Sequence, residues 1–310
     1  MHWLDELTSN AVAGPSAVTI GVFDGVHLGH QHLFAVLCAE AQRQALKTVA
    51  VTFRNHPRLL LYPDRPFPLI TTTEERIRLI QQQGMDAVIP LTFDADLARV
   101  PAEEFLLALV ARLGMRLLVA GEDFALGYHR QGTLQVVREL GEKIGFAVAV
   151  VPPFLLDGTV VSSSAIRQAI LEGRVEEATR LLGRPPALEG TVRPGIGRGR
   201  QLGYPTANLE VDAGLAIPAN GIYATWTLLE GKRWPSATSI GVRPTFGNSA
   251  RTIETYILGF NGNLYGQRLR LEFIRRLREE RAFPSVQALV EQMGRDIEEA
   301  RSILTTPSRV

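Results

Sequence analysis

Short apolar runs alternate with longer amphipathic segments from residue 17 to about residue 182. The runs are rich in β-branched residues, which favours buried strands of a parallel sheet. We expect these strands at residues 18–23, 48–53, 87–91, 117–120 and 146–151. The segments between them carry apolar side chains at helical spacing, as Leu33, Phe34, Leu37 and Ala41 do. This repeat predicts an α/β domain with helices on both faces of the sheet and ligands bound beyond the carboxyl ends of the strands.

The pattern changes at residues 183–186, Gly-Arg-Pro-Pro, because consecutive prolines end a helix and stiffen a linker. We therefore predict a domain boundary between residues 183 and 184. Closely spaced strands with turn residues between them follow, and they favour a small antiparallel β-barrel. These strands are expected near residues 190–193, 221–229, 236–241, 253–260 and 267–274. A final helix over 284–304 is expected to pack on the barrel through Val286, Leu289, Val290, Met293 and Ile297.

Composition narrows the classes of partner. The chain has 310 residues, and 33 basic against 32 acidic side chains give a net charge of +1. No overall field draws such a chain to nucleic acid or to a membrane, so we expect small-molecule partners, while the oligomeric state stays open. Cys38 is the only cysteine, which excludes an internal disulfide and fits a reducing compartment. The start of the chain is unlike a signal peptide and no run could span a bilayer, so we expect a cytoplasmic protein.

Residues 18–30, Val-Thr-Ile-Gly-Val-Phe-Asp-Gly-Val-His-Leu-Gly-His, lead from a strand through a glycine-rich turn into a helix. The glycines let a polyphosphate approach the backbone, and a helix beginning near Leu28 points free N–H groups at it. His27 and His30 can donate hydrogen bonds to phosphate oxygens as charge builds in a transition state. A zinc site is disfavoured, because no third ligand lies nearby in the sequence.

Three further segments follow predicted strands of the same domain. Residues 161–167, Val-Ser-Ser-Ser-Ala-Ile-Arg, combine hydroxyls, a helix start and an arginine, which favours a grip on β- and γ-phosphates. Serines at a helix start also serve simply as caps. Residues 121–132 and 52–57 leave the ends of other strands and are expected to line one crevice with the glycine-rich turn. Each is also compatible with an ordinary polar loop.

The second domain has its own candidate chemistry. Residues 195–208 contain four glycines and two arginines, followed by Thr206 and Asn208. Residues two apart on a strand face the same way, so a hydroxyl and an amide oxygen would together meet Mg²⁺. Glu254 opens a strand and is a candidate base for an alcohol that attacks ATP. Arg243 and Phe246 lie on a turn where they could sandwich a planar ring. Taken alone, each position also fits a flexible loop or a solvated side chain.

Taken together, these motifs resemble the bifunctional prokaryotic riboflavin kinase and FAD synthetase family, in order along nearly the whole chain. The resemblance to the adenylyltransferase half depends on residues 21–30, 121–124 with Arg130, and 162–167. The resemblance to the kinase half depends on residues 199–208, 243–247, Glu254 and Leu264-Tyr-Gly. The resemblance implies a Rossmann-like nucleotidyltransferase domain over residues 1–183, then a six-stranded antiparallel barrel with a C-terminal helix over residues 184–310.

The resemblance also implies an activity: riboflavin and ATP give FMN, and FMN and a second ATP give FAD and pyrophosphate, with Mg²⁺ as cofactor. His27 and His30 would stabilise the transition state at the α-phosphate, and Glu254 would accept the proton of the ribityl hydroxyl. The implied ATP-binding residues are Gly21, Phe23, Asp24, Gly29, Ser162, Ser163, Arg167, Gly199, Arg200 and Thr206. The implied flavin-binding residues are His56, Pro57, Asp123, Arg130, Arg243 and Phe246, and the implied magnesium ligands are Thr206 and Asn208.

Four positions depart from the family pattern. Ser164 stands where the family usually has threonine, Ser239 where it often has asparagine, and Gly259 and Asn263 where it often has aspartate. Two alternatives are a nucleotidyltransferase for another acceptor and a flavin-binding regulator whose catalysis has decayed. The Pro-Thr-Ala-Asn stretch disfavours the first alternative, and the presence of Thr206, Asn208 and Glu254 favours activity over the second.

Overall fold

The computed structural model describes residues 3–9, 12–195, 197–243 and 250–305. The chain forms two compact units, Met1–Ser163 and Ser164–Val310. The boundary predicted between residues 183 and 184 therefore lies after α7 (Ser163–Leu171) and α8 (Val175–Leu182) in the chain. These two helices mostly belong to the second unit. Glu176 of α8, for example, accepts a hydrogen bond from Nε of Arg275 at 3.0 Å.

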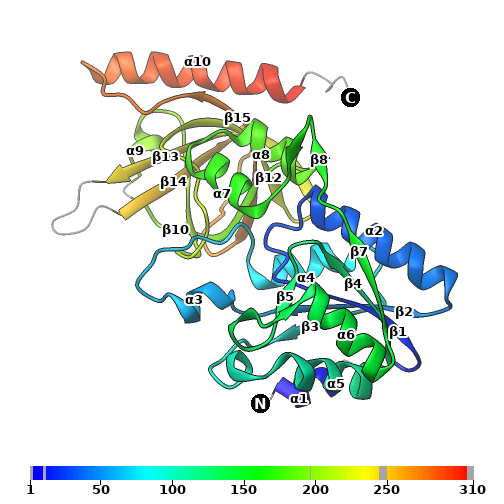
Figure 1. The fold of residues 1–310 in the computed structure, drawn as a ribbon. Helices are drawn as coiled ribbons and strands as arrows, with labels where there is room; N and C mark the ends of the chain where they lie inside the picture. The colour runs from blue at the N-terminus through cyan, green and yellow to red at the C-terminus, as the bar shows by residue number, and fades with distance from the viewer. Residues whose placement is uncertain (1–2, 10–11, 196, 244–249, 306–310) are drawn as a thin grey trace. The chain divides into compact units, whose positions relative to one another are not determined.

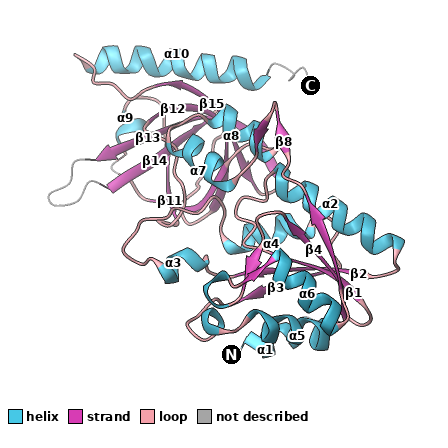
Figure 2. Ribbon diagram, in the orientation of Figure 1, coloured by secondary structure: helices cyan, strands magenta, loops and turns pink. Residues whose placement is uncertain are grey.

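The elements of the first unit are drawn in Figures 1 and 2. Its helices are α1 (Trp3–Ser9), α2 (Leu28–Arg43), α3 (Pro57–Leu61), α4 (Thr73–Gln81), η1 (Leu97–Arg99), α5 (Ala102–Leu113), η2 (Tyr128–Arg130) and α6 (Leu134–Ile144). The strands are β1 (Ser16–Ile20), β2 (Lys47–Phe53), β3 (Ala87–Leu91), β4 (Met115–Gly121), β5 (Ala125–Leu126), β6 (Gly132–Thr133), β7 (Ala147–Val151), β8 (Leu155–Leu156) and β9 (Thr159–Val160).

The main sheet of this unit is parallel, with the strand order β3-β2-β1-β4-β7, which confirms the predicted α/β class. The chain winds outward from β1 in both directions, so the topological switch point lies between β1 and β4. Ligands of such sheets bind beyond the carboxyl ends of the strands at that point. The predicted first strand is too long, because β1 ends at Ile20 and Phe23 adopts a left-handed backbone with φ 54°.

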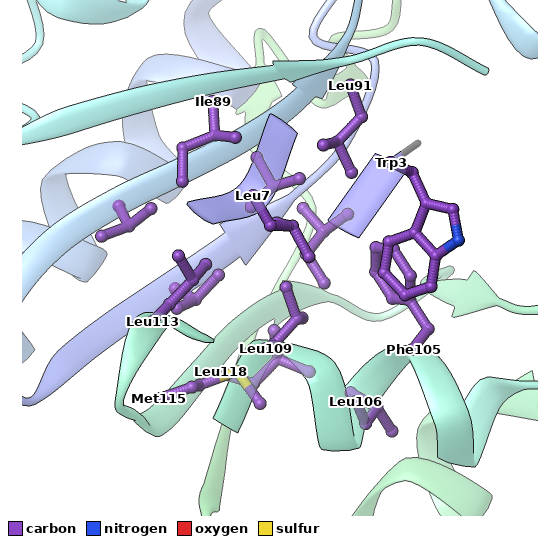
Figure 3. Packing of buried hydrophobic residues seen from close by; sticks show 14 of the residues in the cluster. Trp3, Leu7, Ile89, Leu91, Phe105, Leu106, Leu109, Leu113, Met115 and Leu118 are labelled. Atoms are coloured by element: carbon purple, nitrogen blue, oxygen red, sulfur yellow. The ribbon is translucent and has the colours of Figure 1, made fainter. Parts of the chain in front are cut away.

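Apolar side chains fill both faces of the sheet, which is why its strands read as continuous apolar runs. One layer joins β1–β4 to α1, α5 and α6, and Figure 3 shows Trp3 and Leu7 of α1 beside Phe105 and Leu109 of α5. The Trp3 and Phe105 rings lie 5.4 Å apart. The second layer joins the sheet to α2 and α4, and includes Phe34.

The second unit continues with the barrel strands and two helices. Its remaining elements are β10 (Ala187–Arg193), α9 (Arg198–Gln201), β11 (Ala207–Val211), β12 (Gly221–Leu229), β13 (Lys232–Arg243), β14 (Ala250–Ile257), β15 (Arg268–Arg278) and α10 (Val286–Thr305). The strands close a barrel in the order β10-β11-β14-β13-β12-β15, with antiparallel neighbours. The strand pattern alone does not reveal β11, which is short and follows a glycine-rich loop.

The C-terminal helix lies across the barrel, as predicted (Figure 1). Ala300 and Leu304, in its C-terminal half, are buried against Ala224 and partly buried barrel residues. The predicted apolar stripe behaves differently in the N-terminal half, where Val286 is 56% exposed. Among the described helices, none has the length and apolar character needed to cross a bilayer.

Candidate active sites

The first candidate site begins in the loop between β1 and α2. Phe23 and Val26 have φ angles of 54° and 41°, and Gly25 has 83°. Non-glycine residues held in this region store conformational strain, which clusters at functional sites. His27 is the N-cap of α2, and its Nδ1 accepts a hydrogen bond from the backbone N–H of His30 at 3.3 Å. That bond leaves the proton of a neutral His27 on Nε2, so this nitrogen is a hydrogen-bond donor.

The two predicted histidines lie against each other. Their ring centroids are 3.6 Å apart with an interplanar angle of 20°, and the Phe23 ring meets His30 edge-on at 5.3 Å. His27 is buried, and a Cβ at Gly29 would lie 3.1 Å from His27 Cε1. Glycine at this position therefore lets the His27 ring lie close to the first turn of α2. A Cβ at Gly21 would similarly lie 2.7 Å from the Phe23 ring.

Asp24 holds the same loop in place. Its buried carboxylate accepts hydrogen bonds from the backbone N–H groups of Ile70 and Thr71 at 3.0 and 3.1 Å. Ser163 Oγ donates to the carbonyl oxygen of Asp24 at 2.9 Å. The structure thus brings the predicted serine segment, with Ser162, to the glycine-rich turn. Asp24 joins two loops, and its assignment to ATP stays a prediction.

The loops that follow β2 and β4 lie at the same edge of the sheet, since all its strands are parallel. His56 caps α3 by accepting the backbone N–H of Arg58 at 3.1 Å, and Pro57 is the first residue of that helix. Arg130 Nη2 donates to the carbonyl oxygen of Asp123 at 3.3 Å. Arg167 lies buried on α7 in the second unit. No contact assigns a ligand to these residues, so their roles stay predictions.

Arg76 is a structural residue of this region that the sequence did not reveal. It is fully buried, and its Nη2 donates to the carbonyl oxygens of Phe53 and Arg54, the second at 3.3 Å. Burial lowers the pKa of Arg76, and the negative charge of Asp24 opposes that shift. Arg76 therefore holds the chain where β2 leads into the His56 loop. It lies among charged residues of an amphipathic helix, so nothing in the sequence set it apart.

The second candidate site is a cavity of about 1050 Å³ on the outer wall of the barrel. Residues of β14 alternate between this cavity and the interior, because Thr252, Glu254 and Tyr256 line the cavity whereas Ile253 and Thr255 are buried. The predicted trio comes together here. Asn208 lies opposite Glu254 on the neighbouring strand β11, and Thr206 Oγ1 donates to Glu254 Oε2 at 3.2 Å.

The glycine-rich loop forms one end of the cavity, which Gly195, Gly197 and Gly199 line. A Cβ at Gly195 would lie 2.2 Å from Asn208 Nδ2. A Cβ at Gly199 would lie 2.5 Å from the carbonyl oxygen of Tyr204 and 3.0 Å from Thr206 Oγ1. Glycine at positions 195 and 199 therefore permits the close approach of the loop to the Asn208 and Thr206 side chains. The backbone of Arg200 lies in α9.

The helix α10 contributes apolar side chains to the same cavity. Val286, Leu289, Met293 and Ile297 line it, although the sequence predicted that this stripe would pack on the barrel. The prediction holds only toward the C-terminal end of the helix. An apolar stripe on a helix does not reveal whether it covers a core or a ligand cavity.

Some predicted residues lie at or beyond the limits of the described chain. Arg243 ends β13, where the structure describes only its backbone, and Phe246 lies outside the described residues. Among the positions that depart from the family pattern, Ser239 lines the cavity and pairs with Glu254 across β13 and β14. Gly259 and Asn263 are not among the described residues that line it. The described residues contain no cluster of three or more His, Cys, Asp or Glu side chains arranged for a metal.

The two sites define a class of protein. A parallel sheet with paired histidines at a helix N-terminus suits nucleotidyl transfer, and a cavity with a hydroxyl, an amide and a carboxylate suits phosphoryl transfer to an alcohol. The structure is that of a two-domain transferase of phosphate-containing groups.

Comparisons with known proteins agree with this class. The family model for FAD synthetase matches residues 9–165, and the model for riboflavin kinase matches residues 182–304. The chain is 37% identical over 298 residues to the bifunctional riboflavin kinase/FMN adenylyltransferase of Pseudomonas fluorescens, covering 94% of this chain and 93% of that protein. It is 33% identical over 295 residues to the protein of the same name from Escherichia coli K12, covering 94% of each chain.

A solved structure extends the similarity to the fold. A crystal structure described as a macrolide-efflux protein from Streptococcus pneumoniae superposes with a TM-score of 0.88 at 33% sequence identity. The match covers 95% of this chain and 96% of that one. The chain belongs to the family of bifunctional riboflavin kinase/FMN adenylyltransferases.

Proposed function

We propose that this chain makes FAD from riboflavin in two ATP-dependent steps, each in its own unit. The barrel unit phosphorylates riboflavin to FMN, and the α/β unit transfers an adenylyl group to FMN with release of pyrophosphate. The observation that carries the proposal is the joining of Thr206, Asn208 and Glu254 in one cavity of the barrel. Family models for both activities match the chain in the same order.

In the barrel unit, Glu254 is the proposed general base. The carboxylate faces a cavity that has polar groups at one end and an apolar helix face along another wall. We assign the flavin ring to the apolar side chains of Leu289 and Met293, and the terminal hydroxyl of the ribityl chain to Glu254, which lines the same cavity. Glu254 then takes the proton from the terminal hydroxyl as its oxygen attacks the γ-phosphate of ATP.

The glycine-rich loop is the proposed ATP-binding segment of the barrel. It approaches the Thr206 and Asn208 side chains closely, and its backbone N–H groups suit a polyphosphate. Thr206 and Asn208 supply a hydroxyl and an amide oxygen, which fit the preference of Mg²⁺ for a few oxygen ligands completed by water and substrate phosphates. We assign these two residues to the ion, which would neutralise charge on the β- and γ-phosphates when bound. The family resemblance implies an ATP-binding role for Arg200 as well.

In the α/β unit, the acceptor is the phosphate of FMN. Its second pKa is about 6, so it is already anionic near pH 7 and needs no general base. His27 and His30, at the N-terminus of α2, are assigned to the α-phosphate of ATP, where negative charge increases in the transition state. Ser162 and Ser163 are assigned to the remaining phosphates, and the family resemblance also implies an ATP-binding role for Arg167. The loops that carry His56 and Asp123 are assigned to the flavin.

A chromatographic time course with purified protein, riboflavin, ATP and Mg²⁺ tests the proposal. We expect FMN to rise first and FAD to follow, and FMN supplied directly should give FAD without a lag. Chelation of Mg²⁺ with excess EDTA should stop FMN formation, and restoring the ion should restore it. Riboflavin binding with neither product would contradict the proposed function.

A further inference from the structure

A largely buried ion pair joins α10 to the barrel at the cavity described above. Arg278, the last residue of β15, donates from Nη2 to Asp296 Oδ2 at 2.7 Å and from Nε to Asp296 Oδ1 at 2.9 Å. The Asp296 side chain is 6% exposed and that of Arg278 is 18% exposed. Gln292, one turn earlier on α10, also donates to Asp296 Oδ1 at 2.7 Å. Both members of the pair line the cavity.

The ion pair lies between two parts of α10, one packed against the barrel and the other lining the cavity. Toward the C-terminus, Ala300 and Leu304 are buried in an apolar cluster with the barrel. Toward the N-terminus, Val286, Leu289 and Met293 face the cavity instead. The ion pair thus lies between the buried C-terminal half of α10 and the half whose apolar side chains line the cavity.

The same guanidinium also organises the segment that leads into α10. Arg278 Nη1 donates to the carbonyl oxygen of Glu279 at 2.9 Å, and the Arg278 guanidinium carbon lies 5.6 Å from the centroid of the Phe283 ring, another cavity residue. One side chain at the end of β15 thus contacts both the connecting segment and the helix. A buried ion pair is seldom more stabilising than apolar residues of the same volume, whereas its bidentate geometry fixes orientation.

We propose that Arg278 and Asp296 are positioning residues that set the N-terminal half of α10 as the wall against which the flavin ring binds. The proposal rests on the kinase activity proposed above for this cavity. The pair does not touch the reacting atoms, so its loss should weaken riboflavin binding and leave the phosphoryl transfer step nearly intact. Adenylylation of FMN, which occurs in the other unit, should not respond.

Asp296→Asn and Gln292→Ala test the proposal, with Glu298→Gln as the matched control. Glu298 lies on the same helix, and its exposed carboxylate pairs with Arg301 at 3.5 Å. We expect Asp296→Asn to raise the riboflavin Kd and KM about ten- to hundredfold, the range for losing a charge-assisted hydrogen bond, with kcat within about threefold. Gln292→Ala removes a partner without leaving a buried charge, so it should fold and raise both constants by a few-fold. Glu298→Gln should match the parent chain.

Riboflavin Kd, read from quenching of flavin fluorescence without ATP, tests the ion pair separately from turnover. Parent chain that binds riboflavin but forms no FMN would refute the proposed kinase activity, and the Kd of the variants would still decide the role of the pair. An unchanged Kd in folded Asp296→Asn, or in Gln292→Ala if the first variant does not fold, would overturn the proposal. A fall in kcat at unchanged KM would overturn it as well.

Discussion

The two candidate sites are built from different structural elements. In the α/β unit, the loop after β1 places His27 and His30 at the start of a sixteen-residue helix, at the switch point of a parallel sheet. In the barrel unit, the site lies on the outside of a closed sheet, where Asn208 and Glu254 face each other on paired strands. The first site thus offers imidazole and backbone N–H donors, and the second combines a glycine-rich loop with a carboxylate.

This difference follows from the acceptors. An alcohol must lose a proton as it attacks phosphorus, so the proposed kinase site needs a base, the role that we propose for Glu254. The phosphate of FMN is already an anion near pH 7, and a carboxylate beside it would repel it. The Asp24 carboxylate of the α/β unit accepts hydrogen bonds from the backbone N–H groups of Ile70 and Thr71. The comparison predicts that each activity can be removed separately.

Glu254→Gln should have the largest effect. The amide cannot accept the proton of the ribityl hydroxyl, so FMN formation should fall roughly a hundred- to ten-thousandfold, the usual contribution of a general base. FAD formation from supplied FMN should be unchanged. Initial rates of both reactions on one preparation measure the effect. Glu210→Gln, on the adjacent strand and in an exposed pair with Arg193, is the control. Equal loss of both activities in folded protein would break the comparison.

His30→Ala should produce the opposite pattern. Removing one donor to the α-phosphate is expected to lower FAD formation roughly a hundred- to thousandfold, as for other donors to a developing negative charge. FMN formation should not change. His32 lies on the same helix and contacts Phe154, so His32→Ala controls for effects on α2 itself. If His32→Ala lowered FAD formation as much as His30→Ala, the assignment of His30 to the phosphate would be wrong.

A matched pair of glycine substitutions sharpens the comparison at a smaller scale. In Gly199→Ala the new methyl would lie 2.5 Å from the carbonyl oxygen of Tyr204 and must displace the loop beside Thr206. In Gly29→Ala it would lie 3.1 Å from the His27 ring, which must give by a few tenths of an ångström. We expect about a tenfold loss of FMN formation in the first variant and a few-fold loss of FAD formation in the second. The steady-state KM for ATP in each reaction measures the effect of each substitution. If Gly199→Ala impaired FAD formation, or Gly29→Ala impaired FMN formation, the two ATP sites would not be independent.

The main features of both sites were predictable because they rest on local rules. The Gly-rich turn with His27 and His30 follows a strand and opens a helix, so backbone geometry alone placed it at the sheet edge. Thr206 and Asn208 are two apart, and that spacing put both side chains on one face. The end of β1 was misplaced because Phe23 continues the apolar pattern while its backbone turns left-handed.

What the sequence could not reveal depends on contacts between distant segments. Arg76 reads as part of a polar helix face, yet the fold buries it against the carbonyl oxygens of Phe53 and Arg54. Leu289 and Met293 read as core residues, because helical periodicity is the same whether the helix faces a barrel or a cavity. The pairing of Arg278 with Asp296 joins a strand to a helix, and neither position has a local signature.

Asp86→Asn gives the smallest expected effect and asks whether the units can be perturbed separately in stability. The backbone N–H of Thr48 donates to Asp86 Oδ2 at 2.8 Å and holds the pKa of this carboxyl below its usual 3.8. A pKa lowered by folding adds stability at pH values above the pKa of the unfolded chain, and this contribution is lost as pH falls through the pKa of the folded chain.

Asp86 is 39% exposed, so solvent screening limits the loss in free energy of unfolding to about 0.5–1 kcal/mol at pH 7. The urea transition of the α/β unit is the one in which FAD formation is lost. Its midpoint by circular dichroism should therefore be lower in Asp86→Asn than in the parent chain at pH 7. The two midpoints should converge toward pH 3. Asp96→Asn is the control, because the Asp96 side chain is 79% exposed, and it should change neither midpoint. If Asp86→Asn also shifted the transition in which FMN formation is lost, the two units would be coupled in stability.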